Sequence, residues 1–180
     1  MANDRHKPRN AVEQVDSGST FYARLGYDVA HFGPMWHLLK LAQLIENDLN
    51  RIAGEQGLSL ADFHLLGALM MEAPRPMRAT DLAHALNVSN TVLTGRVRRL
   101  AEAGLLRRDA DAGDRRSTRL ALTGDGERKV RDIGRVMETN GRFVAELGRL
   151  TGGDQQTLSH ILRSLHIGME RHFLPRSRPE

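Results

Sequence analysis

Residues 89–123 read SNTVLTGRVRRLAEAGLLRRDADAGDRRSTRLALT, and this stretch decides the fold that we expect. Ser89 is a suitable N-cap for a helix, because its hydroxyl can accept a hydrogen bond from a free amide of the first turn. The apolar residues that follow recur at helical spacing and predict one buried stripe: Leu93, Val97 and Leu100. Gly104 is expected to end this helix, since glycine readily adopts the left-handed conformation that follows a helix C-terminus.

After Gly104 the pattern changes to that of two short strands joined by a turn. Residues 105–109 are half apolar, and residues 117–122 alternate in polarity as a half-buried strand does. The turn-rich segment between them supplies the tip of a hairpin, with Asp111, Gly113, Asp114, Arg115 and Arg116. A helix that can enter a major groove, followed by a hairpin with an arginine tip, predicts a winged helix-turn-helix.

The composition is that of a folded protein. The 180 residues suffice for one domain or two small packed ones, and 40% are hydrophobic while 27% are charged. The chain contains no cysteine, which excludes disulfides, thiol nucleophiles and thiolate metal sites. No apolar run approaches the roughly 18 residues that span a bilayer, and the polar start MANDRHKPRN is not a secretory signal. We therefore expect a cytoplasmic protein with no membrane partner.

Positive charge is concentrated in the predicted winged helix-turn-helix. Residues 75–119 hold ten arginines against five acidic residues, a net charge of +5, whereas the whole chain carries +4. This distribution is typical of a nucleic-acid-binding protein, and a solvated arginine face is the alternative. The same segment has no aromatic residue on which single-stranded bases could stack, so double-stranded DNA is the expected partner.

Helices on both sides of this module complete the expected organisation. Apolar spacing predicts helices over residues 21–32, 35–53, 60–72, 124–147 and 154–173, with a short one after Thr80. The expected N-caps are Ser19, Ser59, Thr80, Thr123 and Thr151. The predicted boundaries are a disordered tail at 1–18, N-terminal helices at 19–56, the winged helix-turn-helix at 57–122, C-terminal helices at 123–175 and a tail at 176–180.

The predicted fold class is mainly α (α+β), with the long N- and C-terminal helices forming a dimerisation domain. These amphipathic helices lie outside the winged module, so something must cover their apolar stripes. A matching set from a second subunit would do so, and a two-fold dimer would place two recognition helices one DNA turn, about 34 Å, apart on a palindromic site. Folding back within one chain is the alternative.

The chain resembles the MarR-type (multiple-antibiotic-resistance) transcriptional regulators over roughly residues 34–172. The residues that carry the resemblance are ATDLA at 79–83, VS at 88–89, RLAEAGL at 99–105, DRR at 114–116 and LALTGDG at 120–126. The resemblance implies a homodimeric winged-helix regulator whose outer helices form the dimer interface. It also implies that Arg116 reaches into the minor groove while Asp114 holds the wing. Arginine suits a narrow minor groove, and a neighbouring carboxylate can orient a guanidinium.

The first turns of the predicted recognition helix are expected to read bases. Asn90 can pair bidentately with adenine, and the methyl groups of Thr91 and Thr94 can contact a thymine methyl; plain solvent exposure is the alternative for the threonines. Ser89 is expected both to cap the helix and to offer its hydroxyl or amide to a phosphate. The later arginines of the helix are predicted phosphate contacts. The predicted DNA-binding set is Ser89, Asn90, Thr91, Thr94, Arg98, Arg99, Asp114, Arg115 and Arg116.

Arg96 departs from the family pattern, which usually has an apolar residue there. Arg96 falls beside the inward stripe, and a buried guanidinium needs a carboxylate or an anionic ligand. The urate-responsive branch of the family is similar in placing an arginine there, but with an acid where this chain has His64 and a tryptophan in its N-terminal extension. We therefore predict an anionic aromatic effector rather than urate, bound near Trp36, His37, Phe63, His64 and Arg96. The alternative is an ion pair of Arg96 with Asp62 or a glutamate, and no ligand.

Neither a metal site nor an enzyme is predicted, and no cofactor is expected. No two of the eight histidines are spaced i, i+4, and His160 and His166 would point to different faces of one helix. The chain shows no nucleophile elbow, phosphate loop or paired-acid motif. The leading interpretation is a sequence-specific DNA-binding transcriptional regulator, a homodimeric repressor released by a small effector. The alternative is a winged-helix protein–protein interaction module, which would not need the arginines of the recognition helix and wing.

Overall fold

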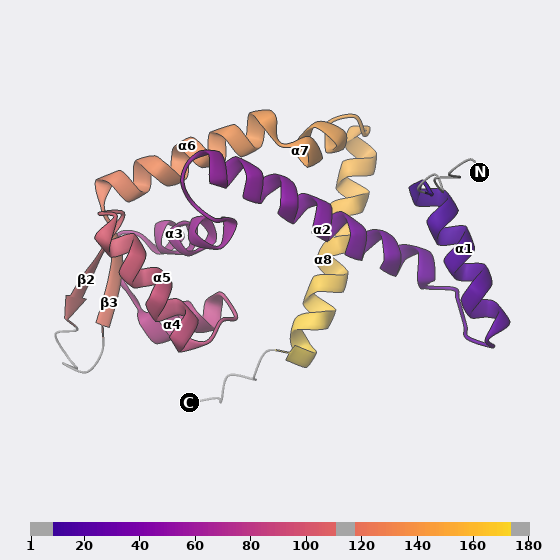
Figure 1. The fold of residues 1–180 in the computed structure, drawn as a ribbon, viewed down its shortest axis with the longest axis horizontal. Helices are drawn as coiled ribbons and strands as arrows, with labels where there is room; N and C mark the ends of the chain where they lie inside the picture. The colour runs from indigo at the N-terminus through magenta and orange to yellow at the C-terminus, as the bar shows by residue number, and fades with distance from the viewer. Residues whose placement is uncertain (1–8, 111–117, 174–180) are drawn as a thin grey trace, which may run out of the picture. The chain divides into compact units, whose positions relative to one another are not determined.

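The computed structural model of the protein describes residues 9–110 and 118–173 (Figure 1). It confirms a mainly helical fold with one small antiparallel sheet. The elements run in the order α1 (Ala11–Arg24), α2 (Phe32–Glu55), α3 (Leu60–Glu72), β1 (Met77–Arg78), α4 (Ala79–Ala85), α5 (Asn90–Glu102), β2 (Leu106–Ala110), β3 (Thr118–Leu122), α6 (Gly124–Asn140), α7 (Arg142–Leu147) and α8 (Gly152–Phe173). They form two compact units, and the boundary lies within α2, between Asn47 and Asp48.

The core of the second unit is built by α3, α4, α5, α6, the sheet and the end of α2. The apolar stripe predicted for the recognition helix is buried there as expected, at Leu93, Val97 and Leu100. Burying each such aliphatic side chain stabilises the fold by about 1.5–3 kcal/mol. The largest fully buried side chains are Ile52, Leu65, Leu66, Leu82, Leu93, Leu100, Leu120 and Ile133. The core therefore holds α5 firmly through one face and leaves the opposite face exposed.

The sheet contains the predicted hairpin and one strand that was not predicted. Its strand order is β1-β3-β2, and both pairings are antiparallel. The two residues of β1 follow Pro74 and Pro76 and are too few to show an alternating pattern. They become a strand only because Met77 pairs with Leu120 of β3.

The first unit contains a helix where a disordered tail was predicted. The prediction is wrong from residue 11 onwards, because Asn10 and Glu13 form a capping box that starts α1. The Asn10 side chain accepts from the Glu13 amide at 3.0 Å, and the Glu13 carboxylate accepts from the Asn10 amide at 2.9 Å. Ser19, the predicted cap, lies inside this helix. A Cβ at Gly18 would collide with the ring of Phe32, so the glycine lets α1 pack on the first turn of α2.

Other helix boundaries also differ from the prediction. The helix predicted over residues 21–32 is wrong, because α1 ends at Arg24 and α2 begins at Phe32. Thr80 lies within α4 rather than at its cap, and the N-cap residue, Arg78, makes no side-chain capping bond. The predicted helix from 124 to 147 is broken at Gly141, whose backbone is extended (φ −68°, ψ 124°) between α6 and α7. The amide of Arg142 donates to the Asp48 carboxylate of α2 at 2.7 Å. The carboxylate thus accepts from an amide at the start of α7, which in an unbroken helix would donate to a backbone carbonyl of the preceding turn.

The start of α6 is tied to the turn that follows α5. The hydroxyl of Thr123 donates to the Gly104 carbonyl at 2.7 Å, and its amide donates to the Leu105 carbonyl at 3.2 Å. Gly104 has a φ of 71°, the left-handed conformation expected after α5. Gly126 lies so close to the Leu105 carbonyl that a Cβ would collide with it. The end of the recognition helix is therefore packed directly on the backbone of α6.

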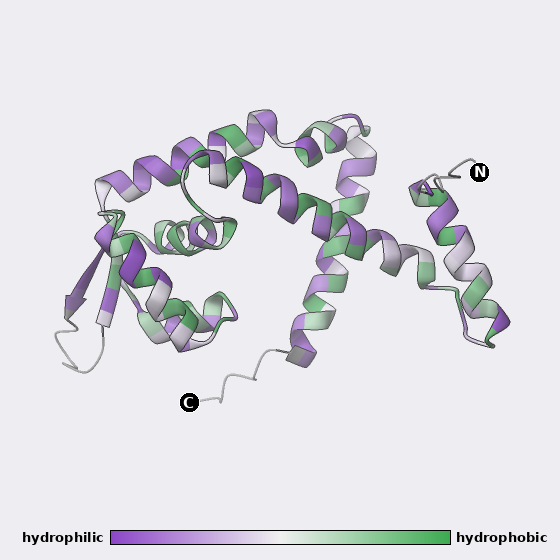
Figure 2. Cartoon of the chain, in the orientation of Figure 1, coloured by the Kyte–Doolittle hydropathy of each residue, from purple (hydrophilic) through white to green (hydrophobic). Residues whose placement is uncertain are grey.

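Apolar side chains remain exposed along the flanking helices. Hydrophobic residues are spread along α2 and α8 between hydrophilic ones (Figure 2). Large exposed ones include Met35, Leu38, Leu39, Leu41 and Leu44 on α2, and Ile161, Leu162, Leu165, Ile167 and Met169 on α8. None of the helices in the described part of the chain is long and apolar enough to cross a membrane.

Candidate nucleic-acid interface

The N-terminus of α5 is capped as predicted. The Ser89 side chain accepts a hydrogen bond from the Val92 amide at 3.3 Å, with Ser89 itself in an extended conformation. Asn90, Thr91 and Thr94 are all exposed on the first turns, as is Ser89. A capped helix end of this kind presents amide groups and a positive dipole end to an anion.

The Thr94 hydroxyl is already used inside the helix. It donates to the Asn90 carbonyl at 2.7 Å. A hydroxyl has a single proton, so Thr94 can offer only its methyl group or an oxygen lone pair to another molecule. The geometry therefore favours the apolar contact predicted for this threonine over a donated hydrogen bond.

The two arginines that were predicted to contact phosphates are held differently. The Arg98 side chain is 75% exposed, and its Nε lies 3.9 Å from a carboxylate oxygen of Glu102. The Arg99 side chain is 61% exposed, and its Nη2 lies 2.6 and 2.7 Å from the two carboxylate oxygens of Asp62 on α3. The alternative that paired Asp62 with Arg96 is therefore wrong.

The residues predicted for the tip of the wing lie outside the described structure. Asp111, Gly113, Asp114, Arg115 and Arg116 belong to residues 111–117, which the structure does not describe. The strands that lead to them are described, and Ala110 pairs with Thr118 at the end of the ladder. Arg107 pairs with Ala121 toward the other end of the ladder, and its Nε lies 3.4 Å from the carboxylate of Asp109, which is next to Ala110.

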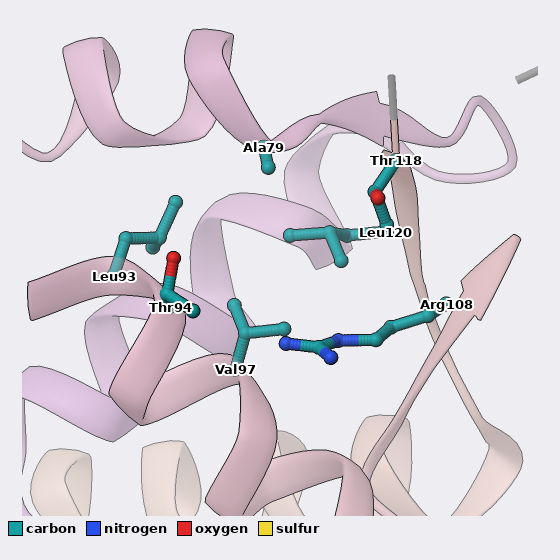
Figure 3. A pocket seen from close by; sticks show the side chains of 7 residues that line it. All are labelled: Ala79, Leu93, Thr94, Val97, Arg108, Thr118 and Leu120. Carbon is teal, nitrogen blue, oxygen red and sulfur yellow. The ribbon is translucent and has the colours of Figure 1, made fainter. Parts of the chain in front are cut away.

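A hollow of about 230 Å³ lies between α5 and the β2–β3 hairpin (Figure 3). Its lining residues are Ala79, Leu93, Thr94, Val97, Arg108, Thr118 and Leu120. In Figure 3 the Arg108 side chain extends from its strand toward Val97 of α5. Arg108 and Thr118 were not predicted as site residues. Arg108 pairs with the buried Leu120, so the two side chains lie on the same face of the sheet. The alternation of faces along a strand would therefore have identified Arg108.

The five residues predicted for an effector lie on α2, α3 and α5, and none of them lines this hollow. Phe63 and His64 have ring centroids 6.1 Å apart on α3. Arg96 is half-buried, and no ion pair joins it to another of the described residues. Trp36 and His37 belong to the first unit, where the Trp36 ring stacks on Phe32 with centroids 5.8 Å apart.

The described residues contain no group of three or more histidine or acidic side chains that could hold a metal ion. His166 instead lies 3.2 Å from the Glu170 carboxylate on the same helix.

Comparison with known protein sequences identifies the family to which this winged helix-turn-helix protein belongs. A model of the MarR family matches residues 56–117. The HTH-type transcriptional regulator PecS of Dickeya dadantii (strain 3937) is 31% identical over 138 residues, which cover 76% of this chain and 80% of PecS. The chain belongs to the MarR family of DNA-binding transcriptional regulators.

Solved structures agree with this assignment. Sco3205 of Streptomyces coelicolor, a MarR family transcriptional regulator in complex with DNA, is 26% identical with a TM-score of 0.69 over 79% of this chain and 94% of its own. AbsC of the same organism is 21% identical with a TM-score of 0.66 over 91% of this chain and 98% of its own. The latter likeness covers the flanking helices as well as the winged helix-turn-helix.

Proposed function

We propose that the protein is a homodimeric repressor that binds a palindromic operator in double-stranded DNA and is released by a small anionic aromatic molecule. The observation that carries the proposal is the geometry of α5. Its inner face is fixed in the core by Leu93, Val97 and Leu100, while its capped N-terminal turns are exposed and polar. A rigid helix with this division between its faces suits insertion into a major groove.

Base reading is assigned to Asn90, Thr91 and Thr94. Phosphate binding is assigned to Ser89, to Arg98 and Arg99 of α5, and to the arginines of the wing. Asn90 supplies the donor and acceptor that adenine requires, and the Thr94 methyl supplies an apolar contact for thymine. The proposed wing contact is made by Arg115 and Arg116, with Asp114 orienting the latter. Sco3205, which shares the fold, has been solved in complex with DNA.

A second copy of the chain is the proposed cover for the apolar faces of the flanking helices. Leu39 and Leu44 on α2 and Leu165 and Met169 on α8 are among the exposed side chains. Exposed apolar faces of this kind are typical of subunit interfaces. A two-fold dimer would present two copies of α5 to two half-sites.

The proposed effector site uses Arg96 for charge and aromatic groups for stacking. Arg96 is half-buried without an ion pair among the described residues, so an anion would give it a partner. Phe63, His64, Trp36 and His37 are the proposed aromatic partners. Because Trp36 is the only tryptophan, its fluorescence gives a direct readout of binding. Arg96→Ala should abolish the response to an effector, whereas Arg108→Ala, in the separate hollow, should leave it intact.

Selection from randomised DNA duplexes, followed by fluorescence anisotropy over a salt series, tests DNA recognition. We expect an enriched palindrome, affinity that falls steeply with salt, and weaker binding by Arg116→Ala. An unselected duplex of equal length is the control. If no sequence is enriched and the selected and control duplexes bind equally weakly, the protein is instead a winged-helix interaction module.

A further inference from the structure

Asp62 is the one buried charged residue among those that the structure describes, and it lies inside the DNA-binding module. Its side chain is 4% exposed and accepts hydrogen bonds from two residues, Ser59 and Arg99. Within α3, it accepts from the Ser59 hydroxyl at 2.7 Å and from the Ser59 amide at 3.3 Å. From α5, it accepts from Arg99, 37 positions further along the chain. The carboxylate therefore joins the start of α3 to the recognition helix.

The geometry of the pair leaves most of the Arg99 guanidinium available. Both carboxylate oxygens of Asp62 converge on a single nitrogen, Nη2. A guanidinium has five N–H donors in a planar fork, and within the described residues Nε and Nη1 of Arg99 make no hydrogen bond. The side chain is 61% exposed, so these donors face solvent while Nη2 is held.

We propose that Asp62 is a positioning residue for DNA binding, which holds Arg99 so that its Nε and Nη1 donors bind a backbone phosphate. The inference rests on the proposed DNA-binding function. A guanidinium can bridge two anions, because its fork presents donors in more than one direction. Since Asp62 already restricts the rotamers of Arg99, less side-chain freedom is lost when the phosphate binds.

Arg98 provides a contrast within the same helix. Its only described acidic neighbour, Glu102, lies at 3.9 Å and is itself exposed, so no close ion pair holds the side chain in one position. A mobile cation binds phosphate through its charge, which lysine supplies as well as arginine. Arg99 is different, because an ammonium group at that position would be drawn to Asp62 and could not also reach a phosphate.

The test compares Arg99→Lys with Arg131→Lys on a selected duplex, by anisotropy over a salt series. Arg131 is the matched control, because it is an exposed arginine of α6 that pairs with a carboxylate, that of Glu127 at 2.9 Å, and is not among the proposed DNA contacts. We expect Arg99→Lys to weaken binding about tenfold and to lower the slope of log K against log salt by about 0.9, the contribution of one phosphate contact. Arg131→Lys should change neither quantity. Asp62→Asn should also weaken binding, because Arg99 is then no longer held.

The double variant Asp62→Asn/Arg99→Lys separates positioning from a purely structural role. Removing the carboxylate frees the ammonium, so this variant should bind more tightly than Arg99→Lys alone. Ser59→Ala is the stability control, because it removes the Ser59 hydroxyl that donates to Asp62 and should lower the melting temperature without changing the slope. A wild-type slope for Arg99→Lys, or a double variant weaker than both single ones, would overturn the inference. If the wild-type protein shows no preference for any duplex, the proposed function itself fails.

Discussion

The core around α5 and the apolar faces of the flanking helices contain similar residues in opposite situations. Leu66 of α3 is fully buried, whereas Leu39 of α2 is 64% exposed. The core around α5 is covered within one chain, because α6 and the end of α2 pack on it together with the winged module. The flanking helices carry the spacing of buried helices without a described cover. The difference is the basis for proposing that a second subunit covers the flanking helices.

Breaking the core should have the largest effect. Leu66→Ala removes a fully buried side chain and should lower the free energy of unfolding by about 2–5 kcal/mol, since a cavity remains. Urea unfolding at a fixed protein concentration measures this loss. Met71→Ala, at an 82% exposed position on the same helix, is the control and should leave stability nearly unchanged. Equal effects of the two substitutions would contradict the described core.

The next largest effect is expected from a substitution on an exposed apolar face. Leu39→Ala should raise the dissociation constant of the dimer by at least about tenfold, because a two-fold interface loses the side chain twice. Analytical ultracentrifugation over a range of concentrations gives the dissociation constant. Met71→Ala serves here too, since Met71 lies on α3, outside the helices proposed for the interface, and should not shift the equilibrium. An unchanged dissociation constant for Leu39→Ala would place this face outside the interface.

A smaller effect is expected at the α2–α7 contact. The Arg142 amide, and then the Arg51 side chain, lower the pKa of Asp48 by hydrogen bonding to its carboxylate. A lowered pKa in the folded state contributes stability above the unfolded value of 3.8, and this contribution is lost as the pH falls toward the lowered pKa. Asp48→Asn should therefore be less stable than the wild type at neutral pH and lose less stability below about pH 4. Melting curves of both proteins at several pH values test this prediction. If both proteins lose the same stability as the pH falls, the Asp48 carboxylate does not make this contribution.

Features that depend on neighbouring residues could be predicted from the sequence. Ser59, Ser89 and Thr123 cap their helices as expected, because a cap is a contact across three residues. The apolar stripe of α5 and the β2–β3 hairpin were found through their periodicity. Local patterning also identified the exposed residues of the α5 N-terminus.

Features that depend on distant residues could not be predicted. The strand β1 exists only through its pairing with β3, and α7 is capped by Asp48, 94 positions earlier in the chain. An ion pair of Asp62 with Arg96 was the alternative to an effector site, yet the structure pairs Asp62 with Arg99. Helical periodicity indicates which side chains face inward, but not which helix they meet.

The contact between Gly126 and the Leu105 carbonyl has a consequence for inherited variation. Every amino acid except glycine adds a Cβ where that carbonyl already lies, so each missense change of this codon forces the end of the recognition helix away from α6. The substitutions reachable by a single base change from a glycine codon, such as Ala, Ser and Val, all carry that atom. Selection on regulation would therefore remove such alleles even though Gly126 is not among the proposed DNA contacts, and glycine would persist there as lineages diverge.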